Sequence, residues 1–296
     1  MKTSHFLQLL LLGALWGASF LFTRLAVPEL GPLWLVAVRV LAGALFLLVV
    51  ASLLRSTLAL RGHWRHFFCL GFLNTALPFA LFAYAATTLT ASLLSIINST
   101  APLWGVTFGM LLSRQLPAPR IIGGLAAGLI GVSLLVLRDP AALAAGSAWP
   151  VVAALLAPVC YGLASHYARL RTAHVAPMAV AHGSMWGALL CLLPLLPFSP
   201  RLSSAMLSAG GMAAALALGV LCTGLAYQIY FRLVREIGAA SALTVTFLIP
   251  LFGILWGALF LQEAVTGTTF VGAAFVLLGT ALVTGFNPLA LRSQRA

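Results

Sequence analysis

The sequence predicts an all-α polytopic membrane protein, with ten transmembrane helices arranged as two inverted five-helix repeats. Three observations predict this fold class: an extreme composition, long continuous apolar stretches, and a second half that repeats the first. Of the 296 residues, 62% are hydrophobic and only 7% are charged. An ordinary soluble domain carries about 25% charged residues, so this composition excludes a soluble enzyme. It also excludes an intrinsically disordered chain, which needs low hydrophobicity and high charge.

The charge-free stretches locate the spans, because a helix needs about 20 mostly apolar residues to cross the hydrocarbon core. The stretch Phe67–Ser113 is too long for one span. A small polar cluster, Thr87, Thr88 and Thr90, divides it. The predicted helices are 5–26, 33–54, 67–87, 91–113, 121–137, 148–168, 177–197, 208–231, 239–261 and 267–286.

The basic residues orient the predicted bundle, because Lys and Arg accumulate in the cytoplasmic loops of membrane proteins. With the N-terminus placed in the cytoplasm, most of the 16 basic residues fall on that side: Lys2, Arg55, Arg61, Arg65, Arg114, Arg120, Arg169, Arg171, Arg232, Arg235, Arg292 and Arg295. The charge distribution therefore predicts a multi-pass protein of the bacterial inner (plasma) membrane with both termini in the cytoplasm. The net charge of +12 fits loops that face anionic lipid headgroups.

An internal repeat relates the two halves of the chain. At a shift of 145 residues, Trp16-Gly17 aligns with Tyr161-Gly162. At a shift of 148, glycines and prolines align with identical residues, among them Gly71 with Gly219, Pro102 with Pro250, Gly105 with Gly253, and Gly124 with Gly272. These residue types have special backbone roles, which favours a true duplication over chance.

The repeat predicts two units, 1–143 with the first five helices and 144–296 with the last five. Because five is odd, the two units enter the membrane from opposite sides. This inverted arrangement is typical of secondary transporters, with a substrate site near the midplane between the halves. The alternative is a duplicated scaffold that transports nothing.

Several runs in the second half resemble the second repeat of EamA-type transporters in the drug/metabolite transporter superfamily. They are Leu218–Tyr227, Ile237–Leu243, Phe247–Gly253 and the pair Gln262-Glu263. The segment from Pro32 to Arg39 is similar to the second helix of the family, and the resemblance covers essentially the whole chain. Gln262-Glu263 departs from the usual Gly-Glu, and the first repeat has Arg114-Gln115 at the matching place.

The resemblance implies ten helices in two repeats and the export of amino acids, metabolites or drugs by alternating access. It also implies a cavity formed by helices 1–4 and 6–9, with helices 5 and 10 as outer supports. The aromatic content is similar to that of the aromatic amino-acid exporters of the family. A substrate role for the acidic position of the motif is not carried over to the first half, because the matching residue there is Gln115.

Polar and aromatic side chains inside the spans are the candidates for substrate binding, because polar groups in a bilayer usually face a cavity or a partner. Amides and hydroxyls would hydrogen-bond a small zwitterionic solute, and aromatic rings would form the apolar wall. The alternative is that they only join helices or pack against lipid. The predicted substrate-binding residues are Trp16, Asn74, Tyr84, Asn98, Ser99, Trp104, His166, Trp186, Tyr227 and Gln228.

Arg39 lies about 9 Å inside the second helix at 1.5 Å per residue. It could bind the carboxylate of a substrate. Alternatively, it pairs with helix-end carbonyls or with Glu29, or extends to the outer interface.

Pro102 and Pro250 occupy equivalent places in the fourth and ninth helices, and each is followed by a small-residue motif that starts at Gly105 or Gly253. A proline inside a helix removes a backbone hydrogen bond and tends to kink it. We therefore expect these four residues to act as hinges that open one side of the cavity and close the other. Static packing is the alternative.

The chain is not expected to be an enzyme, nor to need a cofactor or metal. It has no GxxxxGK[ST], HExxH or GxSxG motif, and none of its four cysteines forms a CxxC pair. The expected partners are a small-molecule substrate and the lipid bilayer, with no nucleic acid, and the chain would act as a monomer or homodimer. An intramembrane enzyme and a solute channel are the competing functions.

Proton coupling through a carboxylate is not expected. The only acids are Glu29, Asp139, Glu236 and Glu263, and the predicted topology puts none of them at the midplane. His166 and His182 are the plausible intramembrane proton carriers, although a neutral, hydrogen-bonded histidine is the alternative for each.

Overall fold

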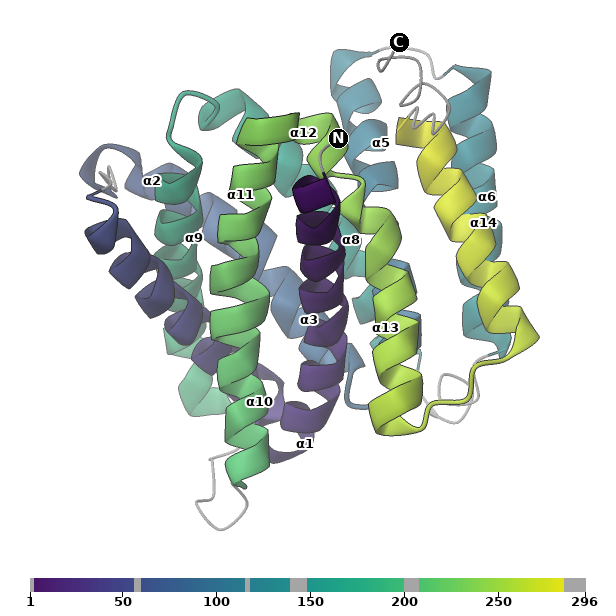
Figure 1. Cartoon of the computed structure of the whole chain (residues 1–296), viewed down its shortest axis with the longest axis horizontal. Coiled ribbons are helices and arrows are strands. Elements are labelled where there is room, and N and C mark those ends of the chain that lie inside the picture. The colour runs from purple at the N-terminus through teal and green to yellow at the C-terminus, as the bar shows by residue number, and fades with distance from the viewer. Residues whose placement is uncertain (1–2, 56–59, 115–117, 139–147, 200–207, 285–296) are drawn as a thin grey trace.

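The computed structural model describes residues 3–55, 60–114, 118–138, 148–199 and 208–284, and in these ranges the secondary structure is entirely helical (Figure 1). The first half contains α1 (Thr3–Leu53), α2 (Leu60–Gly71), η1 (Phe72–Ala76), α3 (Leu77–Ala85), α4 (Ala91–Asn98), α5 (Ala101–Ser113) and α6 (Pro119–Arg138). The second half contains α8 (Trp149–Arg171), α9 (Pro177–Leu192), η2 (Leu193–Phe198), α10 (Ala209–Gly219), η4 (Val220–Leu225), α11 (Ala226–Ile237), α12 (Ala239–Ala242), α13 (Val245–Leu261) and α14 (Gly267–Thr284).

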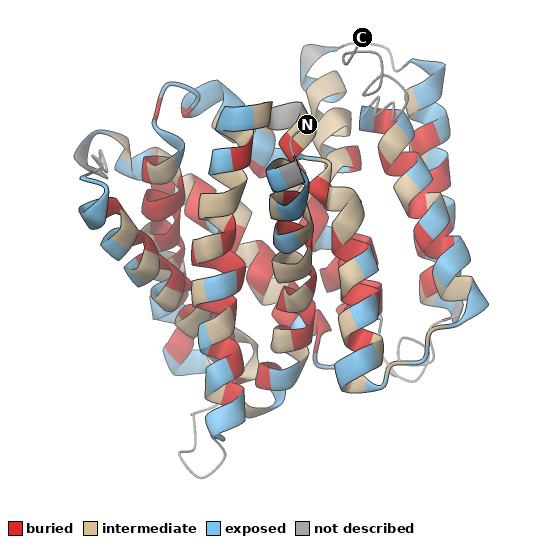
Figure 2. Cartoon of the chain, viewed as in Figure 1, coloured by how far each residue is buried: buried red, intermediate tan, exposed pale blue. Residues whose placement is uncertain are grey.

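These helices are long and apolar enough for a polytopic membrane protein. Within the described ranges, seven helical stretches could cross a membrane by length and composition, and the shorter α13 is also apolar. The outer surface suits lipid, because large apolar side chains such as Leu129 (69% exposed) and Phe270 (63% exposed) point outward. Figure 2 shows buried residues on the faces that the helices turn toward one another.

The first two predicted helices carry one label, α1, but a kink separates them. The kink is at Gly31, where φ is 70° and ψ is 164°, and it lies within the break predicted between residues 26 and 33. Glycine tolerates this positive φ, and Pro32 has no N–H to donate into the preceding turn. The chain therefore turns sharply at Gly31 without a loop.

Two helices contain a π-helical turn that the sequence did not reveal. η1 follows α2 directly, and η4 joins α10 to α11. Such turns hold one extra residue and break the regular i to i−4 ladder. The Thr223 hydroxyl donates to the carbonyl of Leu218, five residues earlier, at 2.9 Å.

The fourth predicted helix is interrupted at Ser99 and Thr100, so α4 and α5 are separate. This corrects the expectation that Pro102 lies in mid-helix, because Pro102 is in the first turn of α5, where its missing N–H costs no hydrogen bond. Pro250 lies inside α13, as expected, while the nearest interruption is at Leu243 and Thr244.

Glycines bring the helices into close contact. α6 and α14 lie side by side at one edge of the bundle (Figure 1), where a Cβ on Gly124 would approach the carbonyl oxygen of Gly279 to 2.8 Å. Elsewhere in the bundle, α1 packs against α10 and α13, and α8 packs against α3 and α5. A central space remains between these groups of helices.

Candidate functional site

A cavity of about 1060 Å³ occupies this central space. Its lining comes from both halves of the chain, with residues of α1, α3, α5, α8, α9, α11 and α13 among them. It reaches the connection between α8 and α9 at Thr172 and Ala173, and the end of α12 at Ser241 and Leu243. α12 lies at the end of the bundle where the N-terminus is (Figure 1), so the cavity extends to that end.

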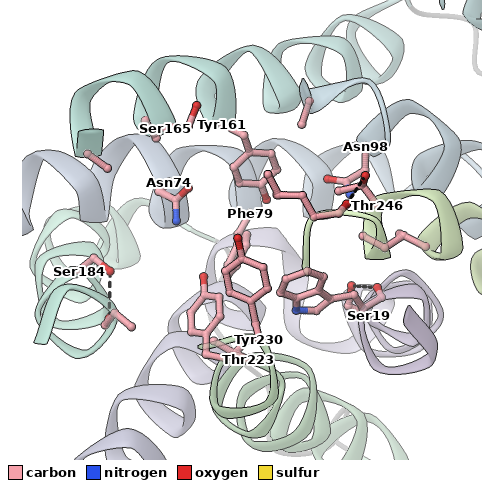
Figure 3. A pocket seen from close by; sticks show the side chains of 18 of the residues that line it. Ser19, Asn74, Phe79, Asn98, Tyr161, Ser165, Ser184, Thr223, Tyr230 and Thr246 are labelled. Carbon is pink, nitrogen blue, oxygen red and sulfur yellow. Dashed lines mark hydrogen bonds between the residues drawn. The ribbon is translucent and has the colours of Figure 1, made fainter. Parts of the chain in front are cut away.

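Aromatic rings form the middle of the cavity wall. Figure 3 shows Phe79, Tyr161 and Tyr230 converging there from three different helices. The Trp16 and Tyr230 rings are 5.5 Å apart, and Phe82 stacks on Tyr161 at 6.5 Å. This wall offers an apolar surface edged by phenolic hydroxyls, as small-molecule sites commonly do.

Arg39 provides a positive charge in this wall. Its Cζ lies 3.6 Å from the centroid of the Phe79 ring, and its Nε donates to the Thr223 hydroxyl at 3.1 Å. The π turn fixes Thr223, because that hydroxyl in turn donates to the Leu218 carbonyl. The alternative in which Arg39 pairs with Glu29 is wrong, since the Glu29 carboxylate binds Ser208 instead.

Amides and hydroxyls complete the lining. In the view of Figure 3, Asn74 lies on one side of the aromatic group, and Asn98 and Thr246 lie on the other. The Ser165 and Ser184 hydroxyls donate to carbonyls of their own helices, at 2.9 Å in both cases. A hydroxyl used in this way can still accept a hydrogen bond from a solute.

Seven of the residues singled out in the sequence line the cavity: Trp16, Arg39, Asn74, Asn98, Pro102, Gly105 and Tyr227. Eight do not: Tyr84, Ser99, Trp104, His166, Trp186, Gln228, Pro250 and Gly253. Tyr84 is 42% exposed and Trp104 is 36% exposed, whereas Ser99 is buried and its hydroxyl donates to the Ile96 carbonyl. A Cβ on Gly253 would meet the Ser95 side chain of α4, and the backbone nitrogen of Gly253 lies beside Gly17 of α1.

The remaining polar side chains of this second group bind neighbouring residues. Trp186 Nε1 donates to His182 Nε2 at 2.9 Å, and the Gln228 amide donates to Met178 Sδ at 3.4 Å. His166 Nδ1 lies 3.2 Å from the guanidinium of Arg169. Only the Gln228 contact joins two helices, α11 and α9, whereas the other two contacts lie within α9 and α8.

The predicted set omitted several lining residues, including Phe79, Phe82, Tyr161, Ser165, Ser184, Tyr230 and Thr246. The repeat alignment offered a signal for Tyr161, because it is the partner of Trp16. Phe79 and Phe82 lie in a uniformly apolar stretch, and nothing in their spacing distinguishes a cavity wall from a lipid-facing side.

The three acids in the described ranges all bind outside the cavity. Glu29 accepts from the Ser208 N–H and hydroxyl at the start of α10, at 2.9 and 2.7 Å. Glu263 accepts from the N–H groups of Ala91 and Ser92 at the start of α4, at 2.6 and 3.0 Å. Glu236 contacts His5 and Arg232. Asp139 lies outside the described residues.

Metal ligands are not gathered at the cavity or elsewhere in the parts of the chain that the structure covers. No group of three or more His, Cys, Asp or Glu side chains lies together there. The lining offers a solute aromatic rings, amides, hydroxyls and the guanidinium groups of Arg39 and Arg169.

Comparison with known proteins gives a consistent assignment. The model of the EamA-like transporter family matches the chain twice, over residues 4–137 and 148–285. The chain is 27% identical to "Uncharacterized transporter YvbV" of Bacillus subtilis over 291 residues, which cover 95% of this chain and 92% of that protein. It is 25% identical to "Protein PecM" of Dickeya dadantii over 281 residues, which cover 94% and 92%.

Solved structures show a similar fold. A crystal structure superimposes with a TM-score of 0.65 over 100% of both chains, at 20% sequence identity. The family resemblance found in the sequence is confirmed by the two matched segments, while the likeness to aromatic amino-acid exporters stays a prediction. The chain belongs to the EamA-like transporter family, and it is a multi-pass membrane transporter.

Proposed function

We propose that this protein is a secondary transporter that exports amino acids, aromatic ones included, or related small metabolites by alternating access. The cavity of about 1060 Å³ between the halves carries the proposal. Ligand sites are commonly about 300–1,000 Å³ and mostly apolar, with a few well-placed polar groups. An aromatic solute would find rings on several sides and hydrogen-bonding groups at Asn74 and Asn98.

The proposal includes ten spans, divided into inverted repeats at residues 1–143 and 144–296. Two helix crossings support it. A Cβ on Gly17 would lie 2.9 Å from the backbone nitrogen of Gly253, and a Cβ on Gly162 would lie 2.9 Å from that of Gly105. The repeat alignment relates Gly17 to Gly162 and Gly105 to Gly253. The crossing of α1 with α13 is therefore equivalent to the crossing of α8 with α5, and each joins one repeat to the other. The double match to the family model also supports two units.

We further propose that the protein resides in the bacterial inner membrane with both termini in the cytoplasm. The loop charges support this orientation. The cavity extends toward the end that carries the N-terminus, so the conformation described here would be open to the cytoplasm. An exporter in this state is ready to receive its solute from inside.

Counterflow in proteoliposomes tests the function. Vesicles loaded with one unlabelled amino acid or the corresponding carboxylic acid are diluted into buffer with a trace of the labelled compound. A carrier gives saturable uptake that the internal solute accelerates, because the loaded carrier returns through the alternating cycle. Uptake that neither saturates nor responds to internal solute indicates a channel, and chemical conversion of the solute indicates an enzyme.

A further inference from the structure

We propose that the cavity recognises its solute by a carboxylate and does not require an ammonium group, so that aromatic monocarboxylate anions are its substrate class. This inference rests on the transport function proposed above and narrows it. Two observations carry it: the cavity lining contains arginines and no acid, and aromatic rings surround Arg39.

Arg39 has unused hydrogen-bonding capacity that faces the cavity. A guanidinium carries five N–H donors. Among the described residues, its only hydrogen bond is the one from Nε to Thr223, and it forms no ion pair. Both terminal nitrogens therefore remain available, in the planar arrangement that binds a carboxylate through two parallel hydrogen bonds.

Within the described ranges, no negative charge lies beside Arg39 to balance it. Tyr161, Tyr227 and Cys222 are the ionisable groups in electrostatic reach of the guanidinium, and tyrosine and cysteine are ordinarily neutral at pH 7. The lining contains Arg169 as a second cation and no Asp or Glu. A charge away from water is costly unless it is paired, so an anion would be stabilised here and a cation would not.

The three acids that the structure describes could not bind an ammonium group without giving up other bonds. Glu29 and Glu263 accept hydrogen bonds at the starts of α10 and α4, and Glu236 binds Arg232 and His5. An amino acid would thus be held by its carboxylate, while its ammonium would meet only neutral groups and two cations. Removing the ammonium should leave the binding intact or improve it.

The rings around Arg39 indicate the body of the solute. The Phe79 ring lies against one face of the guanidinium, and Tyr161 and Tyr230 converge on the same region (Figure 3). Tyr227 and Phe231 extend this wall with stacked rings 5.8 Å apart. A carboxylate on Arg39 would place an attached aromatic group among these rings, where offset or edge contacts are favourable.

Four compounds that share a phenyl ring on a two-carbon chain test the inference: 3-phenylpropionate, 3-phenylpropanamide, phenylalanine and phenethylamine. Their affinities for the purified full-length protein are measured by calorimetry in detergent at pH 7.5. We expect 3-phenylpropionate to bind at least as tightly as phenylalanine. The amide should bind about ten- to a hundredfold more weakly than the acid, because hydrogen bonds to a charged group are the stronger ones, and phenethylamine should not bind.

Three variants locate the selectivity. Arg39→Gln should reduce the ratio of acid to amide affinity to near one, and Arg39→Lys should keep a preference for the acid. Arg171→Gln, at an exposed arginine outside the cavity lining, is the matched control for loss of charge and should keep the full ratio. The ratio is taken within each variant, so a lower yield of folded protein does not affect it.

Equal binding of the amide or the amine, or no binding of 3-phenylpropionate at millimolar concentration, would overturn the inference. An unchanged ratio in Arg39→Gln would also overturn it. The proposed transport function fails separately, in the counterflow experiment: a protein that exchanges amines or neutral solutes is a carrier of another class. If the protein binds the carboxylate but does not exchange it, the proposed carboxylate recognition holds and the proposed carrier function is refuted.

Discussion

Arg39 is held by contacts that join distant parts of the chain. Its position inside a long apolar helix could be predicted from the sequence. Its partner could not, since Thr223 is 184 residues away and its position depends on a π turn with no recognised sequence pattern. The contact of Arg39 with Phe79 could not be predicted either, because it depends on how α3 packs against α1.

Asn98 and Ser99 are adjacent, were both predicted to bind substrate, and differ in the structure. The Asn98 side chain lines the cavity and makes no hydrogen bond to any residue that the structure describes, whereas the Ser99 hydroxyl donates to the Ile96 carbonyl in α4. Asn98→Ala should weaken substrate binding by about 1 kcal/mol, roughly fivefold, through loss of a hydrogen bond to the solute. Ser99→Ala is the control and should bind as the wild type does. If Asn98→Ala and Ser99→Ala bound the substrate equally well, Asn98 would not be a substrate-binding residue.

At the scale of the helices, the sequence predicted where the apolar segments lie but not how they are interrupted. All the predicted ranges contain helix, because span length and apolar composition dictate this in a bilayer. The π turns at η1 and η4 and the break before Pro102 arise from local hydrogen bonding and tertiary packing, which composition does not encode. The cavity lies next to these irregular places, since Thr223 and Pro102 both line it.

Carboxylates cap two helices at their N-termini. Glu263 accepts from two N–H groups and from the Ser92 hydroxyl at the start of α4. Because a negative charge is favourable at a helix N-terminus, Glu263→Gln should lower the stability by about 1–2 kcal/mol. A thermal melt in detergent measures the change. Glu236→Gln is the control for charge removal, since Glu236 binds the side chains of Arg232 and His5 and no N–H group at the start of a helix. An equal loss in both variants would contradict the capping role.

Adjacent glycines of α6 face different surroundings. A Cβ on Gly124 would lie 2.6 Å from Val283 Cγ2 and 2.8 Å from the Gly279 carbonyl oxygen, while a Cβ on Gly123 would meet nothing within 4 Å. Gly124→Val should force α6 and α14 apart and cost about 1–3 kcal/mol, whereas Gly123→Val should cost much less. The melting temperatures of the purified Gly124→Val and Gly123→Val variants measure this difference. Similar melting temperatures would contradict a close contact between α6 and α14 at Gly124.

At the scale of the whole molecule, the charges bear on the driving force of transport. No acid lines the cavity within the described ranges, and His166 and His182 lie outside its lining. We therefore expect export down the gradient of the solute without proton coupling. In liposomes, an imposed pH gradient should not concentrate phenylalanine. Sustained uphill uptake that follows the proton gradient, and that survives His166→Ala combined with His182→Ala, would refute this expectation.

Alternating access requires that a residue in the cavity can be reached from one side of the membrane at a time. Ser165 lines the cavity and is exposed in this conformation, so Ser165→Cys can report which side is open. Cys69, Cys160, Cys191 and Cys222 are first replaced, and an impermeant thiol reagent is applied from one side at a time. We predict labelling from the cytoplasmic side without solute, and labelling from the opposite side once a transported solute is added and the cavity alternates. Labelling from the opposite side alone, or from both sides at all times, would contradict a cavity that opens alternately.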